Sequence, residues 1–223
     1  MKHVIIFLIL IVQGSLSFSQ NVFDLEKIKK ETLDTTASST FTYNSLVEVF
    51  NTNPSLLDIS KGAVIYYGKL FRKDYKPYKF DLKEIEFSKL ISKKKYKRAI
   101  AVGEEIIKKD PANLEILEKL FVCYKKVGLN DKANITEIKL GLLVSSILAQ
   151  GSGQLKENTL KIISVGDEYT IMRALGISGI SRNSVMTGQS TFDTWKAKDS
   201  KGKRIDFFVE LLINLQAPPN FDK

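Results

Sequence analysis

The sequence predicts an α+β protein that is mainly α, with helices first and a small antiparallel β region near the C-terminus. Three observations support this fold class. Apolar residues recur at helical spacing between residues 22 and 150. Ala99 and Ala133 lie 34 residues apart, which is the period of a repeated helical hairpin. Residues 205–213 alternate in the manner of a strand, with every second residue apolar.

Residues 1–19 have the layout of a secretory signal peptide. Lys2 gives a basic start, Val4 to Val12 is an unbroken run of nine apolar residues, and the small residues Ser17 and Ser19 follow. Nine residues are too few to span a bilayer, which takes about 20. We therefore expect an exported chain that is cut after Ser19. The mature protein would have no transmembrane segment and would lie in the periplasm or in the external medium.

Composition excludes several classes of function. The single histidine, His3, lies in the segment to be removed, and Cys123 is the only cysteine. A mature chain without histidine has no histidine-based triad, and it lacks the ligands of the usual zinc sites. No nucleotide-binding glycine motif occurs, so we expect no cofactor. The net charge of +9 is spread along the chain and only five basic residues are arginine, so we expect no nucleic-acid partner.

Residues 20–80 are expected to form an N-terminal helical region. Polar residues at 34–40 and the pair at 53–54 divide this region into three helices, and Asp58 or Ser60 would cap the third. Tyr66 and Tyr67 lie on the apolar face of that helix. We favour a core role for them over a ligand-binding role.

Residues 81–150 resemble about two degenerate tetratricopeptide repeats, which would give four helices in hairpins. Ala99 and Ala133 are the small residues at which the helices of each hairpin would approach, and Gly128 would turn the chain. Phe87 departs from the pattern, because the repeat prefers a small residue at its position. Cys123 fits a buried helical position.

In such a stack, the first helix of each hairpin lines a concave surface. We expect this surface to bind a protein or peptide partner in the cell envelope. Its residues in the second hairpin would be Glu115, Glu118, Lys119, Val122, Lys125 and Lys126. The alternative is that the hairpins only build a core, in a structural envelope component without a ligand groove.

Residues 154–223 are expected to form a small α/β region after a linker at 151–153. A short β-rich run would end at Val165, and a helix over 168–175 would begin at Asp167 as N-cap and stop at Gly176. Strands over 192–197 and 205–213 would form a hairpin with a loop at 199–203. All three regions would pack as one compact unit over 20–223.

Asp167, Glu168 and Asp193 are the candidates for acid–base chemistry. Beside the aromatic rings of Tyr169 and Trp195, they suggest a carboxylate-dependent hydrolase acting on envelope glycans, which needs two carboxylates about 5–10 Å apart. The structural interpretation is favoured, with Asp167 as a helix cap, Tyr169 in the core and Asp193 on the solvent face of a sheet. The preferred interpretation is therefore a non-enzymatic protein.

Short aromatic motifs occur in a fixed order along the chain. They are Tyr66-Tyr67-Gly68, then Phe71, Tyr75, Pro77 and Tyr78, and after the helical middle Asp167-Glu168-Tyr169 and Phe192-Asp193-x-Trp195. This order resembles the secreted bacterial family known as domain of unknown function 4919, over nearly the whole mature chain. The resemblance implies an exported protein without an assigned activity, and it supplies no catalytic residues.

Overall fold

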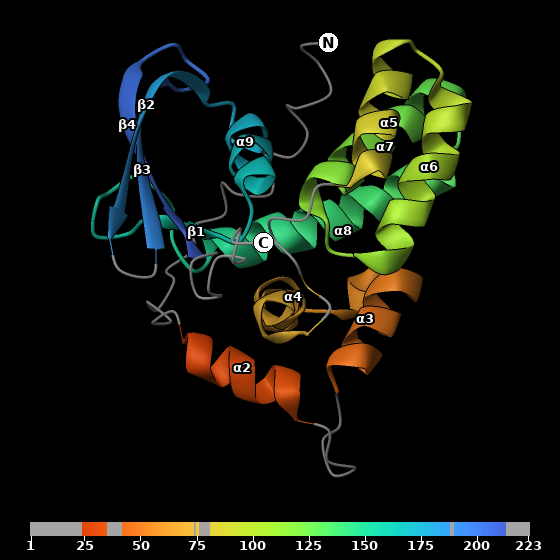
Figure 1. Cartoon of the computed structure of the whole chain (residues 1–223), viewed down its shortest axis with the longest axis horizontal. Coiled ribbons are helices and arrows are strands. Elements are labelled where there is room, and N and C mark those ends of the chain that lie inside the picture. Colours follow the sequence, from red (N-terminus) through yellow and green to blue (C-terminus); the bar gives the residue numbers. More distant parts are fainter. Residues whose placement is uncertain (1–23, 35–41, 74, 76–80, 188–189, 213–223) are drawn as a thin grey trace, which may run out of the picture. The chain divides into compact units, whose positions relative to one another are not determined.

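The computed structural model describes residues 24–34, 42–73, 75, 81–187 and 190–212 (Figure 1). The expected signal peptide at 1–19 lies outside the described residues, as do Pro77 and Tyr78. The contacts of the chain group into two compact units, which we call the helical unit (Leu25–Ser146) and the sheet unit (from Ile147 onward). The expectation that residues 20–223 pack as one compact unit stays a prediction.

The helical unit begins with short helices. They are α2 (Leu25–Leu33), α3 (Tyr43–Thr52), the 3-10 turn η1 (Pro54–Leu56), α4 (Ile59–Tyr67) and the 3-10 turn η2 (Gly68–Phe71). The predicted cap of the third helix is confirmed, because Asp58 Oδ1 accepts a hydrogen bond from the Lys61 amide at 2.8 Å. Tyr66 and Tyr67 are fully buried, with ring centroids 4.8 Å apart in an edge-on arrangement. Their predicted core role is therefore confirmed.

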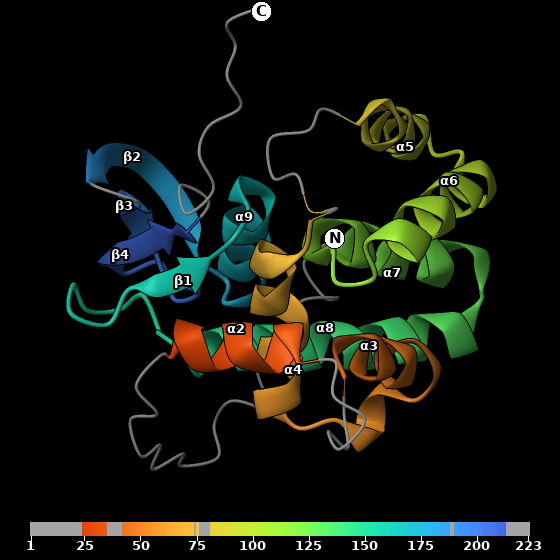
Figure 2. The ribbon, with the colours of Figure 1, turned by 60° about the horizontal axis from the view of Figure 1, so that its bottom comes forward.

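Four longer helices follow in the helical unit and are joined by short turns (Figure 2). They are α5 (Leu82–Ser92), α6 (Tyr96–Lys109), α7 (Leu114–Val127) and α8 (Asn130–Leu148). Ala99 and Ala133 are fully buried, as the hairpin prediction requires. Gly128 ends α7 with a φ of 78°, a left-handed conformation that favours glycine. Among the described residues, no helix is long and apolar enough to span a bilayer.

Glu104 connects three successive helices of this stack. Its carboxylate, on α6, accepts a hydrogen bond from the Tyr124 hydroxyl of α7 at 2.9 Å and one from the Lys132 ammonium of α8 at 2.7 Å. Burial raises the pKa of Tyr124, and the hydrogen bond to Glu104 acts in the same direction. A neutral, donating tyrosine therefore links the helices.

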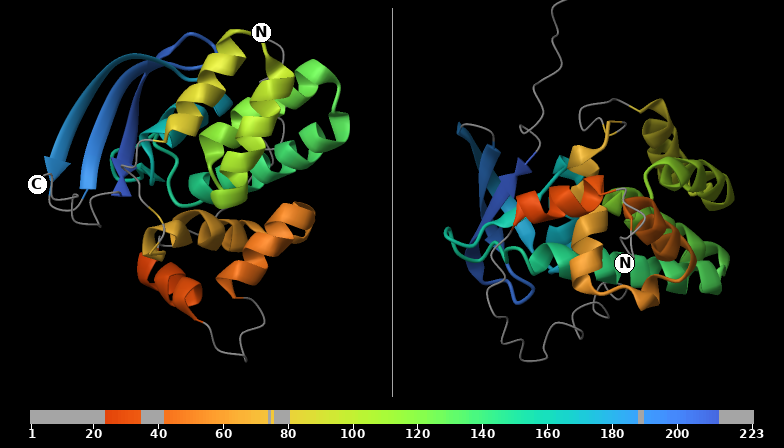
Figure 3. Two further views of the ribbon diagram at one scale, coloured as in Figure 1. Left: turned by 45° about the vertical axis from the view of Figure 1, so that its right-hand side comes forward. Right: turned by 90° about the horizontal axis from the view of Figure 1, so that it is seen from below.

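The sheet unit contains β1 (Leu160–Ile162), α9 (Val165–Ala174), β2 (Ser178–Thr187), β3 (Ser190–Lys198) and β4 (Arg204–Leu211). The strand order is β1-β4-β3-β2, and β2, β3 and β4 form an antiparallel meander. The three long strands run side by side and bend together (Figure 3, left). The predicted fold class, α+β and mainly α with a small antiparallel β region near the C-terminus, is confirmed, and the parallel β1–β4 pair makes the sheet mixed. A parallel pair requires a crossover connection, and α9 lies in that connection.

The predicted hairpin is present. Phe207, Val209 and Leu211 of β4 are buried on one face of the sheet, as the alternation predicts. The loop between β3 and β4 is held by Asp199, whose Oδ1 accepts hydrogen bonds from the amides of Lys201 and Lys203, each at 2.9 Å. The sequence did not predict β2. All ten of its residues are exposed, so it lacks the apolar alternation by which strands are recognised.

Candidate functional site

The six predicted partner-binding residues share one side of α7. The Asn113 side chain caps the helix by accepting a hydrogen bond from the Ile116 amide at 3.1 Å. The opposite side of the helix is buried and apolar, with Leu114, Leu117, Leu120, Phe121 and Tyr124. The six residues therefore remain at the surface: Glu115, Glu118 and Lys119 are partly exposed, and Val122, Lys125 and Lys126 are exposed.

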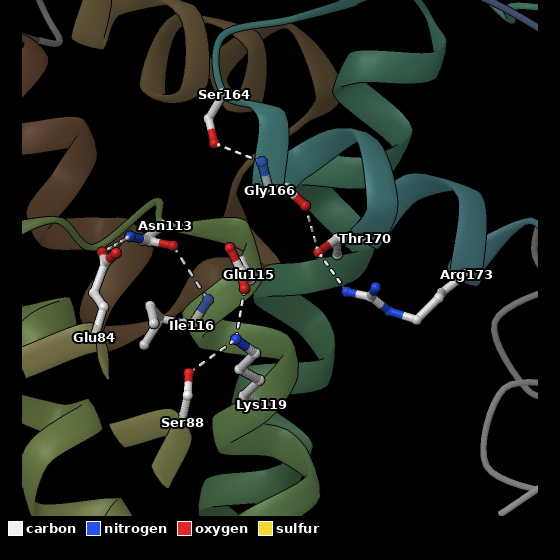
Figure 4. Close-up of polar contacts among 10 residues, drawn as sticks. All are labelled: Glu84, Ser88, Asn113, Glu115, Ile116, Lys119, Ser164, Gly166, Thr170 and Arg173. Carbon is white, nitrogen blue, oxygen red and sulfur yellow. Dashed lines mark hydrogen bonds and ion pairs between the residues drawn. The ribbon is translucent and has the colours of Figure 1, made fainter. Parts of the chain in front are cut away.

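Polar contacts join this side of α7 to α5 (Figure 4). Lys119 Nζ lies 2.5 Å from Glu115 Oε1 and 3.4 Å from Ser88 Oγ of α5. Near the start of α7, Asn113 Nδ2 donates a hydrogen bond to Glu84 Oε1 of α5 at 3.2 Å. The two first helices of the hairpins therefore present one polar surface. We call it the α5–α7 face, and it comprises Glu84, Ser88, Glu115, Glu118, Lys119, Val122, Lys125 and Lys126.

Charges of opposite sign are separated along the α5–α7 face. Glu115 lies in the first turn of α7, whereas Lys125 and Lys126 lie in its last turn, and each placement is favoured by the helix dipole. Burial raises the pKa of Glu84, and the neighbouring carboxylates of Glu115 and Asp81 raise it further. The end of the face that contains Glu84 therefore favours a cationic group.

The helical unit also contains a cleft that the sequence did not predict. Its volume is about 400 Å³. It is lined by Tyr43, Asn44, Val47, Lys69, Arg72, Tyr75, Asp81, Lys83, Glu84, Ile106, Lys108, Lys109, Asp110, Pro111 and Asn113. Glu84 belongs to both the cleft and the α5–α7 face, so the two features are continuous.

Two cations in the cleft are held in place by aromatic rings and polar partners. Lys69, only 7% exposed, places Nζ 2.7 Å from Asp110 Oδ2 and 5.1 Å from the centroid of the Tyr75 ring. Arg72 donates a hydrogen bond to Asn44 Oδ1 at 3.2 Å. The available sequence signal was Lys69 itself, a charged residue directly beside the buried aromatic face of α4.

In the sheet unit, two of the three predicted acid–base candidates converge on one arginine. Arg182 Nη1 lies 3.5 Å from Glu168 Oε2 and 3.5 Å from Asp193 Oδ2. Trp195 Nε1 donates a hydrogen bond to Glu168 Oε1. The guanidinium of Arg182 lies 5.6 Å from the centroid of the Trp195 ring. We call these four residues the carboxylate cluster. Sequence reasoning missed Arg182 because it lies on β2.

Three structural roles inferred from the sequence in this region are wrong. Ser164, not Asp167, caps α9, because Ser164 Oγ accepts a hydrogen bond from the Gly166 amide at 3.1 Å. The helix consequently begins at Val165, and further along it Thr170 contacts Gly166 and Arg173 (Figure 4). Asp167 is instead buried within the first turn of the helix.

The exposure of Tyr169 and of Asp193 is in each case the reverse of the prediction. Tyr169 is 40% exposed rather than part of the core, and it packs edge-on against Trp195 with ring centroids 5.7 Å apart. Asp193 is 4% exposed rather than solvent-facing, because it shares the buried side of β3 with Trp195 and Ala197. A one-residue change of side reverses the exposure of every residue in a strand.

Burial dominates the electrostatics of the carboxylate cluster. It raises the pKa of Glu168, and the Asp193 carboxylate raises it further, whereas the hydrogen bond from Trp195 and the charge of Arg182 lower it. The two carboxylate oxygens that face Arg182 each lie 3.5 Å from the same nitrogen, so the two acids are close to each other. However, Glu168 is only 1% exposed, so the pair is closed to a substrate.

The residues that the structure describes contain no group of three or more histidine, cysteine, aspartate or glutamate side chains that could hold a metal ion. Comparison with curated proteins and with solved structures finds no match for the chain. A family model described as a domain of unknown function, DUF4919, matches residues 26–215, which is most of the chain. The chain therefore belongs to this family, in agreement with the resemblance of its aromatic motifs.

Proposed function

We propose that the protein is exported and binds a protein or peptide partner of the cell envelope on its α5–α7 face. The observation that carries the proposal is the network around Lys119. This side chain, on α7, contacts Glu115 of the same helix and Ser88 of α5, so that two helices present one surface. A surface that spans two helices suits an extended polar segment better than a single helix would.

The charge distribution defines the chemistry of the partner. A bound segment would place basic groups near Glu84 and Glu115 and acidic groups near Lys125 and Lys126. Val122, which is 37% exposed between these two ends, offers an apolar contact at the centre. The proposed partner is thus a segment with separated charges and a central apolar residue.

Export is proposed from the apolar run at Val4–Val12 and the small residues after it. The mature protein would act in the periplasm or in the external medium. Intact-mass measurement of protein recovered from the envelope should show the loss of residues 1–19, within about two residues of that cut. Recovery of the full-length chain in the membrane fraction would contradict the proposal of export.

Two alternatives have less support. A glycan hydrolase would use Glu168 and Asp193, and both carboxylates are buried. A structural component without a groove does not explain why polar contacts align the surfaces of α5 and α7. Neither alternative requires a partner at Val122.

Photo-crosslinking tests the binding proposal directly. A photoreactive amino acid at Val122 should give a discrete adduct when the intact protein is irradiated in its native envelope. Ile138 of α8 is the matched control, because it is also an exposed apolar residue of the helical unit (44%) but lies outside the α5–α7 face. Adducts at both positions, or at neither, would favour the structural alternative.

A further inference from the structure

The carboxylate cluster contains more negative than positive charge in a buried place. Arg182 is the one cation within ion-pair distance of Glu168 and Asp193 among the described residues, and both contacts involve the same nitrogen, Nη1, at 3.5 Å. Two ionised carboxylates against one guanidinium would leave an uncompensated buried charge. Such a charge is costly unless it is neutralised or paired.

The burial of the two acids is nearly complete. Glu168 is 1% exposed and Asp193 is 4% exposed, whereas Arg182 reaches the surface along β2. Asp193 Oδ1 is buried and has no hydrogen-bond partner among the residues that the structure describes. A buried carboxylate oxygen without a donor is rare and calls for a specific explanation.

Within the described part of the sheet unit, the surrounding elements place no second cation within ion-pair distance of the two carboxyls. The buried faces of β4 and β1 present apolar side chains, namely Phe207, Val209, Leu211, Leu160 and Ile162. β3 adds Trp195, which donates to Glu168 Oε1, and β2 adds Arg182. α9 adds the buried carboxyl Asp167 and the ring of Tyr169, and its Arg173 donates to Thr170. Among these contacts, Arg182 is thus the cation that faces the two carboxyls of the cluster.

We propose that the buried Glu168 carboxyl, beside Asp193 and Arg182, is a proton-binding site. The proton leaves one negative charge to balance Arg182. Two like charges that share a buried site cannot both ionise easily, which is the physical basis of such pairs.

Burial identifies Glu168 as the carboxyl that retains the proton. The same environment raises the pKa of Glu168, in spite of the opposing effects of Trp195 and Arg182. On deprotonation the O–H bond of the Glu168 carboxyl breaks and the proton passes to water. Loss of the proton adds one negative charge beside Arg182. The electrostatic attraction between Arg182 of β2 and the cluster therefore depends on pH.

Trp195 provides a direct probe, because it is the only tryptophan of the chain and its indole nitrogen contacts Glu168. When the pH is raised, the tryptophan fluorescence of the full-length protein should change in one step. This step should lie above the pH range of ordinary carboxyls, whose pKa values are about 4. Glu168→Gln should abolish this step while keeping an oxygen that accepts the Trp195 hydrogen bond. Asp193→Asn should move the step to lower pH, because it removes the neighbouring charge.

Asp206→Asn is the matched control. Asp206 is an exposed carboxyl of β4 that pairs with Lys196 at 2.9 Å on the other side of the sheet, so the step should be unchanged in this variant. Carboxyl carbon NMR of the unsubstituted protein gives a second measurement that does not depend on the folding of any variant. It should show one carboxyl resonance, that of Glu168, that titrates above the pH range of exposed carboxyls. A fluorescence step that persists in Glu168→Gln, or carboxyl resonances that all titrate near pH 4, would overturn the proposal.

Discussion

The ring of Phe87 on α5 packs against the bare backbone of α6 at Gly103. A Cβ atom at Gly103 of α6 would lie 2.8 Å from Cε2 of Phe87 on α5 and 2.7 Å from Cδ2 of Leu120 on α7. Phe87 and Leu120 are both fully buried. A large residue on α5 is therefore matched by the absence of a side chain on α6, and this complementarity sets how closely the three helices approach.

Gly103→Ala should destabilise the protein in spite of the better helix propensity of alanine. The propensity gain is about 1 kcal/mol, but the added methyl group overpacks a tight contact, at a cost of about 1–3 kcal/mol. Gly141→Ala is the matched control, because Gly141 lies within α8 and its Cβ would meet nothing within 4 Å. Chemical denaturation should show a lower free energy of unfolding for Gly103→Ala and a higher one for Gly141→Ala. Equal gains for both would show that Gly103 is not tightly packed.

Ala99→Leu should lower the free energy of unfolding by about 1–3 kcal/mol, because Ala99 is fully buried at a helix contact and the larger side chain has no free space. The same substitution at Ala133 should act similarly. Ala101→Leu provides the control, since Ala101 is exposed on the same helix. Its free energy of unfolding should change by less than about 0.5 kcal/mol. Equal midpoints for all three variants would contradict the hairpin packing.

The carboxylate cluster should make stability depend on pH. Since burial raises the pKa of Glu168 above its unfolded value, the folded protein retains a proton that the unfolded chain loses. This contribution to stability is fully present at low pH and is lost as the pH rises through the raised pKa. Unfolding followed across this range should therefore show a smaller decline for Glu168→Gln than for the unsubstituted protein.

Arg182→Gln removes the cation of the cluster instead of a carboxyl, and it serves as a control for the pH dependence of stability. It leaves two buried carboxyls without their cation, a change that typically costs about 3–5 kcal/mol for a buried pair and less here because Arg182 is partly exposed. The loss should shrink at acidic pH, where both carboxyls are protonated. A loss that is independent of pH would indicate that Arg182 contributes only packing.

Cys123 should be inert in the folded protein. Its side chain is fully buried, and burial raises the pKa of the thiol to about 11. Because the thiolate is the reactive form, a disulfide reagent at pH 8 should label native protein far more slowly than protein unfolded in denaturant. Equal labelling rates would show that α7 opens readily or that Cys123 is accessible.

Local patterns in the sequence predicted the helices and the β3–β4 hairpin well. Asp58, Gly128 and the alternation from Ile205 to Leu211 are each a complete signal within a few residues. The errors arose where distant segments decide the outcome. β1 has three residues and is defined by its parallel partner β4. Ser164 and Asp167 are both acceptable caps, and only the packing of α9 selects between them.

The candidate site was predicted only in part for the same reason. Helical spacing alone predicts that the six partner-binding residues share one side of α7. The contacts that define the α5–α7 face and the cleft join residues far apart in the sequence, such as Lys119 with Ser88 and Lys69 with Asp110. Arg182 was missed because β2 has an exposed, polar sequence, and its role depends on Glu168 and Asp193 across the sheet unit.

The proposed function can be tested with a charge reversal that does not disturb the fold. Lys125 and Lys126 are exposed and form no ion pair with any residue that the structure describes. Lys119 is left unchanged, because a glutamate there would face Glu115 and break the contact to Ser88. The double variant Lys125→Glu/Lys126→Glu should keep its melting temperature close to that of the unsubstituted protein, since such surface changes usually act within about 0.5 kcal/mol each. It should weaken capture of the envelope partner, because the charges at the end of α7 set encounter rate and specificity.

Lys97→Glu/Arg98→Glu makes the same change in net charge on exposed positions of α6, outside the α5–α7 face. Capture measured side by side for the two double variants separates a local effect from a general effect of charge. Weaker capture by the α7 variant alone is the result expected for a binding face. Equal weakening in both variants would mean that net charge, rather than this face, attracts the partner, and unchanged capture in both would remove the α5–α7 face as the binding surface.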